Sequence, residues 1–315
     1  MPKKLTPHTK TRSSYYNDAK RNSSFGDGAK GASWIDIISP SKKDLSWLSS
    51  KFHLHPVILR ELEEPSARAG VEVYKNYIYL VYYFPVYEPG EETSRKAEID
   101  FIITPQSVIT VHYEEIEALK NFTQKTAESS LMMFYRVIKA ILRFQERQLT
   151  HIGKKTESIS RELFKEKERD VLKQISRLKR DISEYRVIVR HQGHLLKSLL
   201  TKGPIFWGPE EKPYLNDLFG DHLKLMNQID DYRETISDFE DTNNQLMNLK
   251  INEVMRTFAT LSFLTFPFML VAAIFGMNTR GTPLIDQPHA FWIVFTPMAA
   301  AMAVLVIYFK KKEWI

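Results

Sequence analysis

Residues 258–278, FATLSFLTFPFMLVAAIFGMN, determine the architecture of the C-terminal part of the chain. Its first eighteen residues carry no charge, and residues 290–309 form a second uncharged run of twenty. As helices, runs of this length measure about 27–30 Å, the thickness of the hydrocarbon core of a bilayer. Because the link between them is short, the sequence predicts a membrane hairpin with Gly276, Met277 and Asn278 at its tip.

The basic residues around the hairpin predict its orientation. Lys310, Lys311 and Lys312 follow the second run, Lys250 and Arg256 precede the first, and only Arg280 lies in the link. By the positive-inside rule, both termini are then cytoplasmic. The N-terminus has no apolar signal-peptide core. We therefore expect an integral protein of the cell (inner) membrane, with everything upstream of residue 258 on the cytoplasmic side.

Charge is concentrated in the first 31 residues, which hold seven Lys or Arg against two Asp, or +5 of the formal +6. We interpret this segment as a solvated, disordered arm and expect no nucleic acid partner. The absence of cysteine excludes disulfides and thiolate metal sites. No Ser/His/Asp or kinase-like signature occurs, so we expect no enzymatic activity.

The region before the hairpin predicts an α+β domain followed by long helices. Residues 32–122 alternate strand and helix patterns, with strands at 33–38, 71–74, 77–84, 98–104 and 107–112, which indicates a small mixed or antiparallel sheet. Residues 123–202 predict two antiparallel helices that turn near 164–169, and residues 203–213 predict a linker. The remaining expected segments are a stalk helix at 214–257, spans at 258–275 and 290–309, an outer loop at 276–289 and a basic tail at 310–315.

The stalk predicts packing on one face and negative charge on the others. Apolar residues recur there in a heptad pattern: Leu218, Leu225, Ile229, Tyr232, Ile236, Phe239 and Leu246, with His222 and Asn243 filling the same stripe. Residues 210–253 hold eleven Asp or Glu against four Lys or Arg. We expect one helix of roughly sixty residues that continues into the first span, and a field that concentrates cations if the helix repeats around an axis.

Two spans cannot enclose a pore, so any conduit requires oligomerisation. Asn252, Met255, Ser262 and Phe266 fall near one face of the first span, together with Ala259 and Ala273. Such a face fits a narrow pore with hydrophobic constrictions, and it fits ordinary helix packing equally well. At the tip, a ring of Asn278 amide oxygens suits a hydrated divalent ion, because Mg2+ gives up its waters reluctantly.

The chain resembles the CorA family of divalent metal-ion channels. The similarity includes Phe275-Gly276-Met277-Asn278, Asn252-Glu253-Val254-Met255 before the span, Pro267 within it and Tyr308 to Trp314 after the second span. In the N-terminal domain it includes Trp34-Ile35-Asp36, Phe52 to Pro56 and Val71 to Tyr74. The resemblance covers nearly the whole chain after residue 31.

The resemblance implies a funnel-shaped homopentamer in the lipid bilayer, with passive flux of divalent cations, Mg2+ first and also Co2+ and Ni2+. It implies a selectivity mouth at Gly276, Met277 and Asn278. It also implies a pore lined and gated by Asn252, Met255, Phe258, Ser262 and Phe266. Divalent ions held between cytoplasmic domains would close the pore, and Asp217 is the candidate sensor. Asp221 and His222 resemble a nearby family motif one residue out of place.

The outer loop departs from the family pattern. Many members follow the signature with an acidic Met-Pro-Glu loop, whereas this chain has Arg280 and, as its one acid, Asp286. Positive side chains near the mouth weaken the attraction of cations, which leaves open a Zn2+ transporter of the same family. A non-conducting, membrane-anchored coiled-coil tether is the second alternative. A proton-coupled transporter is disfavoured, because neither span contains a carboxylate.

Overall fold

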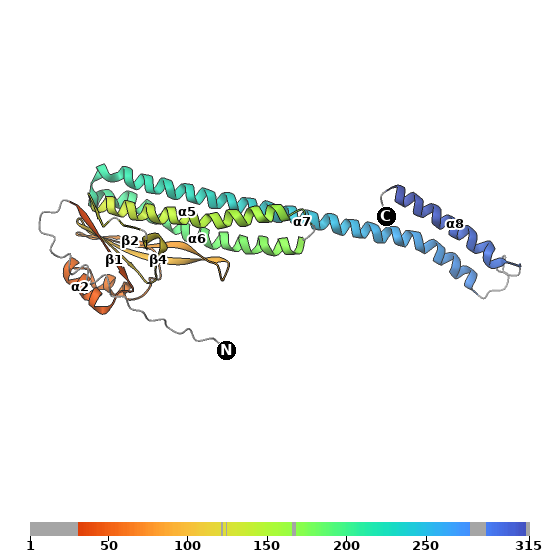
Figure 1. Ribbon diagram of the computed structural model, residues 1–315, viewed down its shortest axis with the longest axis horizontal. Helices are drawn as coiled ribbons and strands as arrows, with labels where there is room; N and C mark the ends of the chain where they lie inside the picture. The colour runs from red at the N-terminus through yellow and green to blue at the C-terminus, as the bar shows by residue number, and fades with distance from the viewer. Residues whose placement is uncertain (1–30, 121, 124, 166–167, 278–287, 313–315) are drawn as a thin grey trace. The chain divides into compact units, whose positions relative to one another are not determined.

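The structure is a computed structural model that describes residues 31–120, 122–123, 125–165, 168–277 and 288–312. The chain divides after Phe239 into two compact units. The first contains a sheet and long helices, and the second contains a helical hairpin. Figure 1 gives the order of the elements.

A six-stranded sheet forms the base of the first unit. Its strands are β1 (Ala32–Ile38), β2 (Gly70–Val73), β3 (Ile78–Glu88), β4 (Thr93–Ile103), β5 (Ser107–His112) and β6 (Thr126–Ala127), in the order β2-β3-β4-β5-β1-β6. All neighbours are antiparallel except β1 and β5, which are parallel, so the sheet is mixed. The sequence predicted the first five strands, but it made β3 and β4 too short. In the structure β3 extends to Glu88, and β4 already begins at Thr93.

Helices cover both faces of this sheet. On one face, α2 (Lys42–Phe52) and α3 (Pro56–Glu61) pack Leu48 and Ile58 against Val81 and Ile109. Ser41 caps α2 in a capping box with Asp44, as its position before the apolar repeat suggests. On the other face, Phe101 packs edge-on against Phe134 of α5 (Ser130–Glu162). Residues that alternate along β3 and β4 thus enter two separate cores.

Helices α5 and α6 (Glu168–Trp207) form the expected antiparallel pair, but two of its predicted boundaries are wrong. The pair does not begin at residue 123, because β6 first closes the sheet edge and Ser129 then caps α5. Nor does α6 break at Lys202. It continues through Pro204 to Trp207. The next residue, Gly208, has a φ of 110° that suits glycine, and its N–H donates to the Pro204 carbonyl at 3.1 Å.

Because α6 ends late, only the short helix η1 (Pro209–Glu211) separates it from α7 (Lys212–Gly276). The expected linker of residues 203–213 is therefore mostly helix. Helix α7 has 65 residues, which confirms the prediction of one helix entering the first span. Its heptad stripe is buried at Leu218, Leu225, Ile229 and Ile236 in the first unit.

Glycines on α5 and α6 make room for this stripe. A Cβ atom at Gly153 of α5 would lie 2.7 Å from the Tyr232 hydroxyl, and one at Gly193 of α6 would lie 2.6 Å from His222 Nε2. Both distances are too short for real Cβ contacts. These glycines let α7 approach the pair closely, and Figure 1 shows the three helices side by side.

In the second unit, α8 (Ala290–Lys311) follows the C-terminal part of α7 as a helical hairpin. Within the described residues, α7 and α8 are long and apolar enough to cross a membrane. Their large side chains are widely exposed, for example Phe291 at 66% and Met269 at 63%. Apolar exposure of this extent is what a lipid-facing surface or a subunit interface requires.

Candidate functional site

The membrane part of α7 has two contrasting faces. One stripe is partly or fully buried and comprises Thr260, Leu264, Phe268, Val271 and Phe275. At 100° per residue, this stripe is centred opposite the face that carries Met255, Ser262 and Phe266. Met255, Phe258 and Phe266 are each 62% exposed. The residues expected to line a pore therefore lie on the side of α7 that its own hairpin partner leaves open.

Helix α8 contributes one matching stripe to the hairpin. Its buried or half-buried residues follow a three-to-four spacing: Ala290, Val294, Met298, Met302, Leu305 and Phe309. Phe309 meets Phe263 of α7 edge-on, with ring centroids 6.1 Å apart. One stripe of each helix is thus used within the subunit, and the other faces remain for lipid or for other copies.

Two hydroxyls of this span are bonded to their own helix. Thr260 donates to the Arg256 carbonyl at 2.8 Å, and Thr265 donates to the Leu261 carbonyl at 3.0 Å. Such bonds satisfy a hydroxyl in an apolar environment without a partner helix. Ser262 lies between them in the sequence and is exposed on the open side of the helix.

The expected mouth is only partly within the described residues. Gly276 is the last residue of α7, and the N–H of Met277 bonds to the Ile274 carbonyl at 3.3 Å. Asn278, Arg280 and Asp286 lie outside the described residues. The roles expected for them stay predictions.

In the first unit, the candidate sensor Asp217 is already paired with a cation. Lys139 of α5 places its ammonium nitrogen 2.7 Å from Asp217 Oδ2, and the same ammonium contacts Asp221 Oδ2. The Tyr135 hydroxyl donates to Asp217 Oδ2 at 2.7 Å. The hydrogen bond from Lys139, with that from Tyr135, lowers the pKa of the Asp217 carboxyl. Asp217 and Asp221 therefore form one anionic site, which the ammonium group of Lys139 occupies.

His222 does not join this site. It is 4% exposed, lies against Gly193 of α6 and stacks on Phe219 at 6.1 Å. Burial, with a smaller contribution from His194, lowers the pKa of His222 to about 4. A neutral imidazole in a helix interface belongs to the packing of α7. Within the described residues, no group of three or more His, Asp or Glu is arranged to hold a metal ion.

The acidic charge of the stalk is partly neutralised by its neighbours. Besides Lys139, Arg186 of α6 lies 2.5 Å from Asp230. The sequence did not indicate either contact, because Lys139 is 82 residues from Asp221 and Arg186 is 44 residues from Asp230. A charge count along one helix overstates the field when the opposite charges lie on its neighbours.

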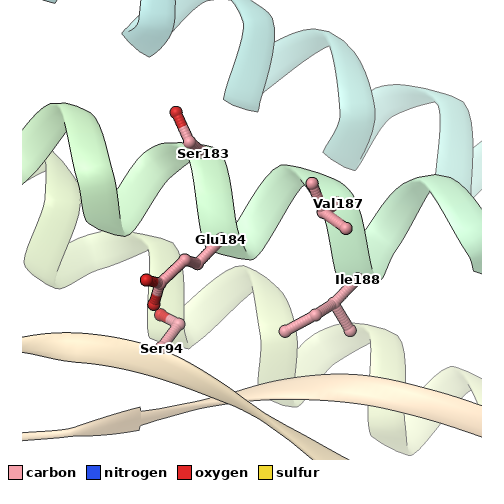
Figure 2. A pocket seen from close by; sticks show the side chains of 5 residues that line it. All are labelled: Ser94, Ser183, Glu184, Val187 and Ile188. Atoms are coloured by element: carbon pink, nitrogen blue, oxygen red, sulfur yellow. The ribbon is translucent and has the colours of Figure 1, made fainter.

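One surface pocket lies apart from these sites, where α6 passes the start of β4. Ser94, Ser183, Glu184, Val187 and Ile188 line it (Figure 2). Its polar groups are already bonded within the fold. Ser94 donates to Asp181 at 2.7 Å, and the other Asp181 oxygen contacts His151 at 2.8 Å. The pocket therefore offers no free group to a ligand.

A family model described as "CorA-like Mg2+ transporter protein" matches residues 29–311. The chain belongs to this CorA-like family. The match includes the sheet, the helix pair, the continuous α7 and both hairpin helices. The resemblance inferred from Gly276-Met277-Asn278 and its flanking spans is thereby confirmed.

Curated relatives of the CorA-like chain match along almost its whole length. A "Cobalt/magnesium transport protein CorA" of Thermotoga maritima is 22% identical over 90% of this chain and 83% of its own length. A protein of the same name from Methanocaldococcus jannaschii is 23% identical and covers 90% and 91%. The solved structure titled "The complete structure of CorA magnesium transporter from Methanocaldococcus jannaschii" superposes with a TM-score of 0.76 at 22% identity, over 90% and 91% of the two chains. The CorA-like fold of the present chain follows.

Proposed function

We propose that the chain transports divalent metal cations, Mg2+ first and Co2+ also, through a pore formed by α7 helices of several copies. The observation that carries the proposal is the open face of α7. Met255, Phe258 and Phe266 are each 62% exposed on the side that α8 does not cover. We propose that copies of the chain meet around an axis on this face, because a conduit built from two-span subunits requires several copies.

The proposed metal follows from the family and from the chemistry of the tip. The relatives named above are cobalt/magnesium transport proteins. Amide and backbone oxygens at Gly276, Met277 and Asn278 suit an ion that keeps its waters. Ni2+ would follow as a further substrate. Zn2+ is less favoured, because Cys and His, the ligands that it prefers, are absent from 252–278.

We further propose a homopentamer with both termini cytoplasmic. Two spans per chain cannot surround a conduit, and the resemblance supplies the number five. The lysines at 310–312 and the basic residues before the first span support the orientation. The exposed aromatic side chains of α8, such as Phe291 and Trp292, would then face lipid.

We propose that the carboxylates of Asp217 and Asp221 sense cytoplasmic divalent ions. Both are held by Lys139, so a divalent ion that binds there competes with an ammonium group of the same subunit. Competition of this kind would set the cation concentration at which the sensor responds. His222 is excluded from the sensor by its burial against α6.

Ion uptake into liposomes that contain purified protein tests the proposal. We expect passive Mg2+ and Co2+ uptake that follows the membrane potential and persists without a pH gradient. Asn278→Ala should abolish uptake without changing the assembly, whereas Asn244→Ala, an exposed amide in the stalk, should leave uptake unchanged. Assembly without flux of Mg2+, Co2+, Ni2+ or Zn2+ would leave the tether as the function. Uptake of Zn2+ alone would select the zinc alternative.

A further inference from the structure

Two carboxylates are buried in the sheet of the first unit, away from the sites above. Glu98 and Asp100 lie on β4 two residues apart, so both face the side covered by α2 and α3. Asp100 is 0% exposed and Glu98 is 6% exposed. In the described part of the chain, neither forms an ion pair, although Lys96 is near Glu98 and contacts the Tyr83 ring at 4.0 Å. Unpaired buried carboxylates of this kind are costly and require an explanation.

Each carboxylate is anchored through one oxygen only. The Ser66 N–H donates to Glu98 Oε1 at 2.8 Å, and the Tyr113 hydroxyl donates to Asp100 Oδ2 at 3.2 Å. The other oxygens, Glu98 Oε2 and Asp100 Oδ1, are buried and have no hydrogen-bond partner outside the pair. Two firmly positioned carboxylates thus present one unused oxygen each to the same interior region.

Two hydroxyls beside them are also unused. Tyr79 is 2% exposed, its hydroxyl lies beside that of Ser66, and both hydroxyl oxygens are buried with no hydrogen bond to any other group. The register pairs Tyr79 with Ile102 and Val81 with Asp100, which places Tyr79 diagonal to Asp100 on the same face. The loop that carries Ser66 is held in place, because the Tyr83 hydroxyl donates to the Ser66 carbonyl at 2.6 Å.

The charges around this cluster favour a positive occupant. The pKa of Asp100 is raised to about 8, mainly by burial, and with smaller contributions from the charge of Glu98, from a hydrogen bond between the two carboxyl groups and from the charge of Glu61. Burial also raises the pKa of Glu98. A cation offsets both effects, and an oxygen-only set with two carboxylates is the kind of site that hard divalent ions take.

We propose that Glu98 and Asp100, with the hydroxyls of Tyr79 and Ser66, form a structural site for a hard divalent cation under the loop of residues 63–69. The site lies within one subunit and is separate from the Asp217 sensor and from the transport path. Its ion would join the loop to β4 and stabilise the cytoplasmic unit. The proposal does not depend on the transport function.

Terbium luminescence tests this site in the full-length protein in detergent. Tb3+ prefers hard oxygen ligands and emits strongly when a nearby tyrosine transfers energy to it. The measurement uses an Asp217→Asn background, since Asp217 is the other carboxylate that contacts a tyrosine hydroxyl in the sites described above. We expect tyrosine-sensitised emission, its loss in Glu98→Gln/Asp100→Asn, and its retention in Glu91→Gln/Glu92→Gln, which removes two exposed charges from the same hairpin.

Thermal unfolding with and without Ca2+ or Mg2+ provides a second readout. The ion should raise the unfolding midpoint of the background protein and leave that of Glu98→Gln/Asp100→Asn unchanged. Without ion, the double variant should unfold at the same or a higher temperature, because its buried repulsion is gone, so loss of emission cannot come from misfolding. Emission that survives the double substitution overturns the proposal. The proposal is also overturned if the ions do not change the unfolding midpoint of the background protein and its stability only falls as the pH rises. That result indicates that Glu98 and Asp100 share a proton instead of binding a cation.

Discussion

The ammonium nitrogen of Lys139 lies 2.7 Å from Asp217 Oδ2, so one subunit supplies its own cation to the carboxylate proposed as the sensor. Burial lowers the pKa of Lys139, but the hydrogen bonds to Asp217 and Asp221 outweigh it and raise the pKa above its ordinary value. The lysine therefore stays charged at neutral pH. A divalent ion that binds Asp217 Oδ2 thus competes with this ammonium group.

Lys139→Gln removes this competitor. We expect Mg2+ to bind the sensor more tightly by up to about fivefold, since an ion pair with an exposed partner is worth roughly 0.2–1 kcal/mol. Protection of the full-length protein from trypsin, titrated with Mg2+, measures the change. The gain should disappear in Lys139→Gln/Asp217→Asn. An unchanged Mg2+ midpoint in Lys139→Gln would show that the lysine does not compete.

The close contact between Gly193 and the ring of His222 predicts a second result. Gly193→Ala puts a methyl group where His222 Nε2 is 2.6 Å away, and the rigid ring cannot move without shifting α7. We expect a loss of about 1–3 kcal/mol, as for other overpacked cores. Gly220→Ala is the matched control, because a Cβ there meets nothing within 4 Å, and it should gain about 0.4–1 kcal/mol. Chemical denaturation of the two variants compares them, and equal stabilities would refute the close contact.

Regular periodicity explains what the sequence predicted. The heptad stripe through Leu218, Leu225 and Ile229 indicates a helix with one buried face. The β-branched and aromatic run at 77–84 indicates a buried strand, and the uncharged runs at 258–275 and 290–309 indicate spans. Such patterns locate helices and strands even when the segments that pack against them are unknown. They therefore yielded the α+β domain, the continuous α7 and the hairpin.

What the sequence did not reveal depends on contacts between distant segments. Lys139 reads as a solvated helix residue until α5 lies beside α7 and brings it to Asp217. Glu98 and Asp100 alternate with Ile99 and Phe101, which reads as a polar outer face, yet α2 and α3 cover that face. Gly203 and Pro204 read as a break, but Pro204 lies in the last turn of α6, where only one backbone hydrogen bond is lost.

The buried imidazole of His222 predicts a dependence of stability on pH. Its pKa is about 4 in the fold against 6.5 in the unfolded chain, so the unfolded state takes up a proton first as the pH falls. Stability attributable to His222 is complete above pH 6.5 and is lost towards pH 4, by about 3 kcal/mol at 1.36 kcal/mol per unit.

His222→Leu should therefore lose less stability than the wild type between pH 6.5 and pH 4. Thermal unfolding midpoints measured across this range provide the comparison. His191→Leu, an exposed histidine on α6, should follow the wild-type curve. If the His222→Leu and wild-type curves run parallel, the imidazole is not held neutral by burial.

The two faces of α7 can be told apart by single cysteines, because the natural chain has none. Ser262 lies on the exposed face, and Leu264 is 8% exposed on the face turned to α8. In Ser262→Cys, a thiol would point into the proposed pore, where Cd2+ binds thiolates and blocks the path. We expect Cd2+ to stop Mg2+ uptake by Ser262→Cys liposomes and to leave Leu264→Cys nearly unaffected. Block of Leu264→Cys with sparing of Ser262→Cys would place the conduit on the other side of α7, and the open face would then serve only for packing between copies.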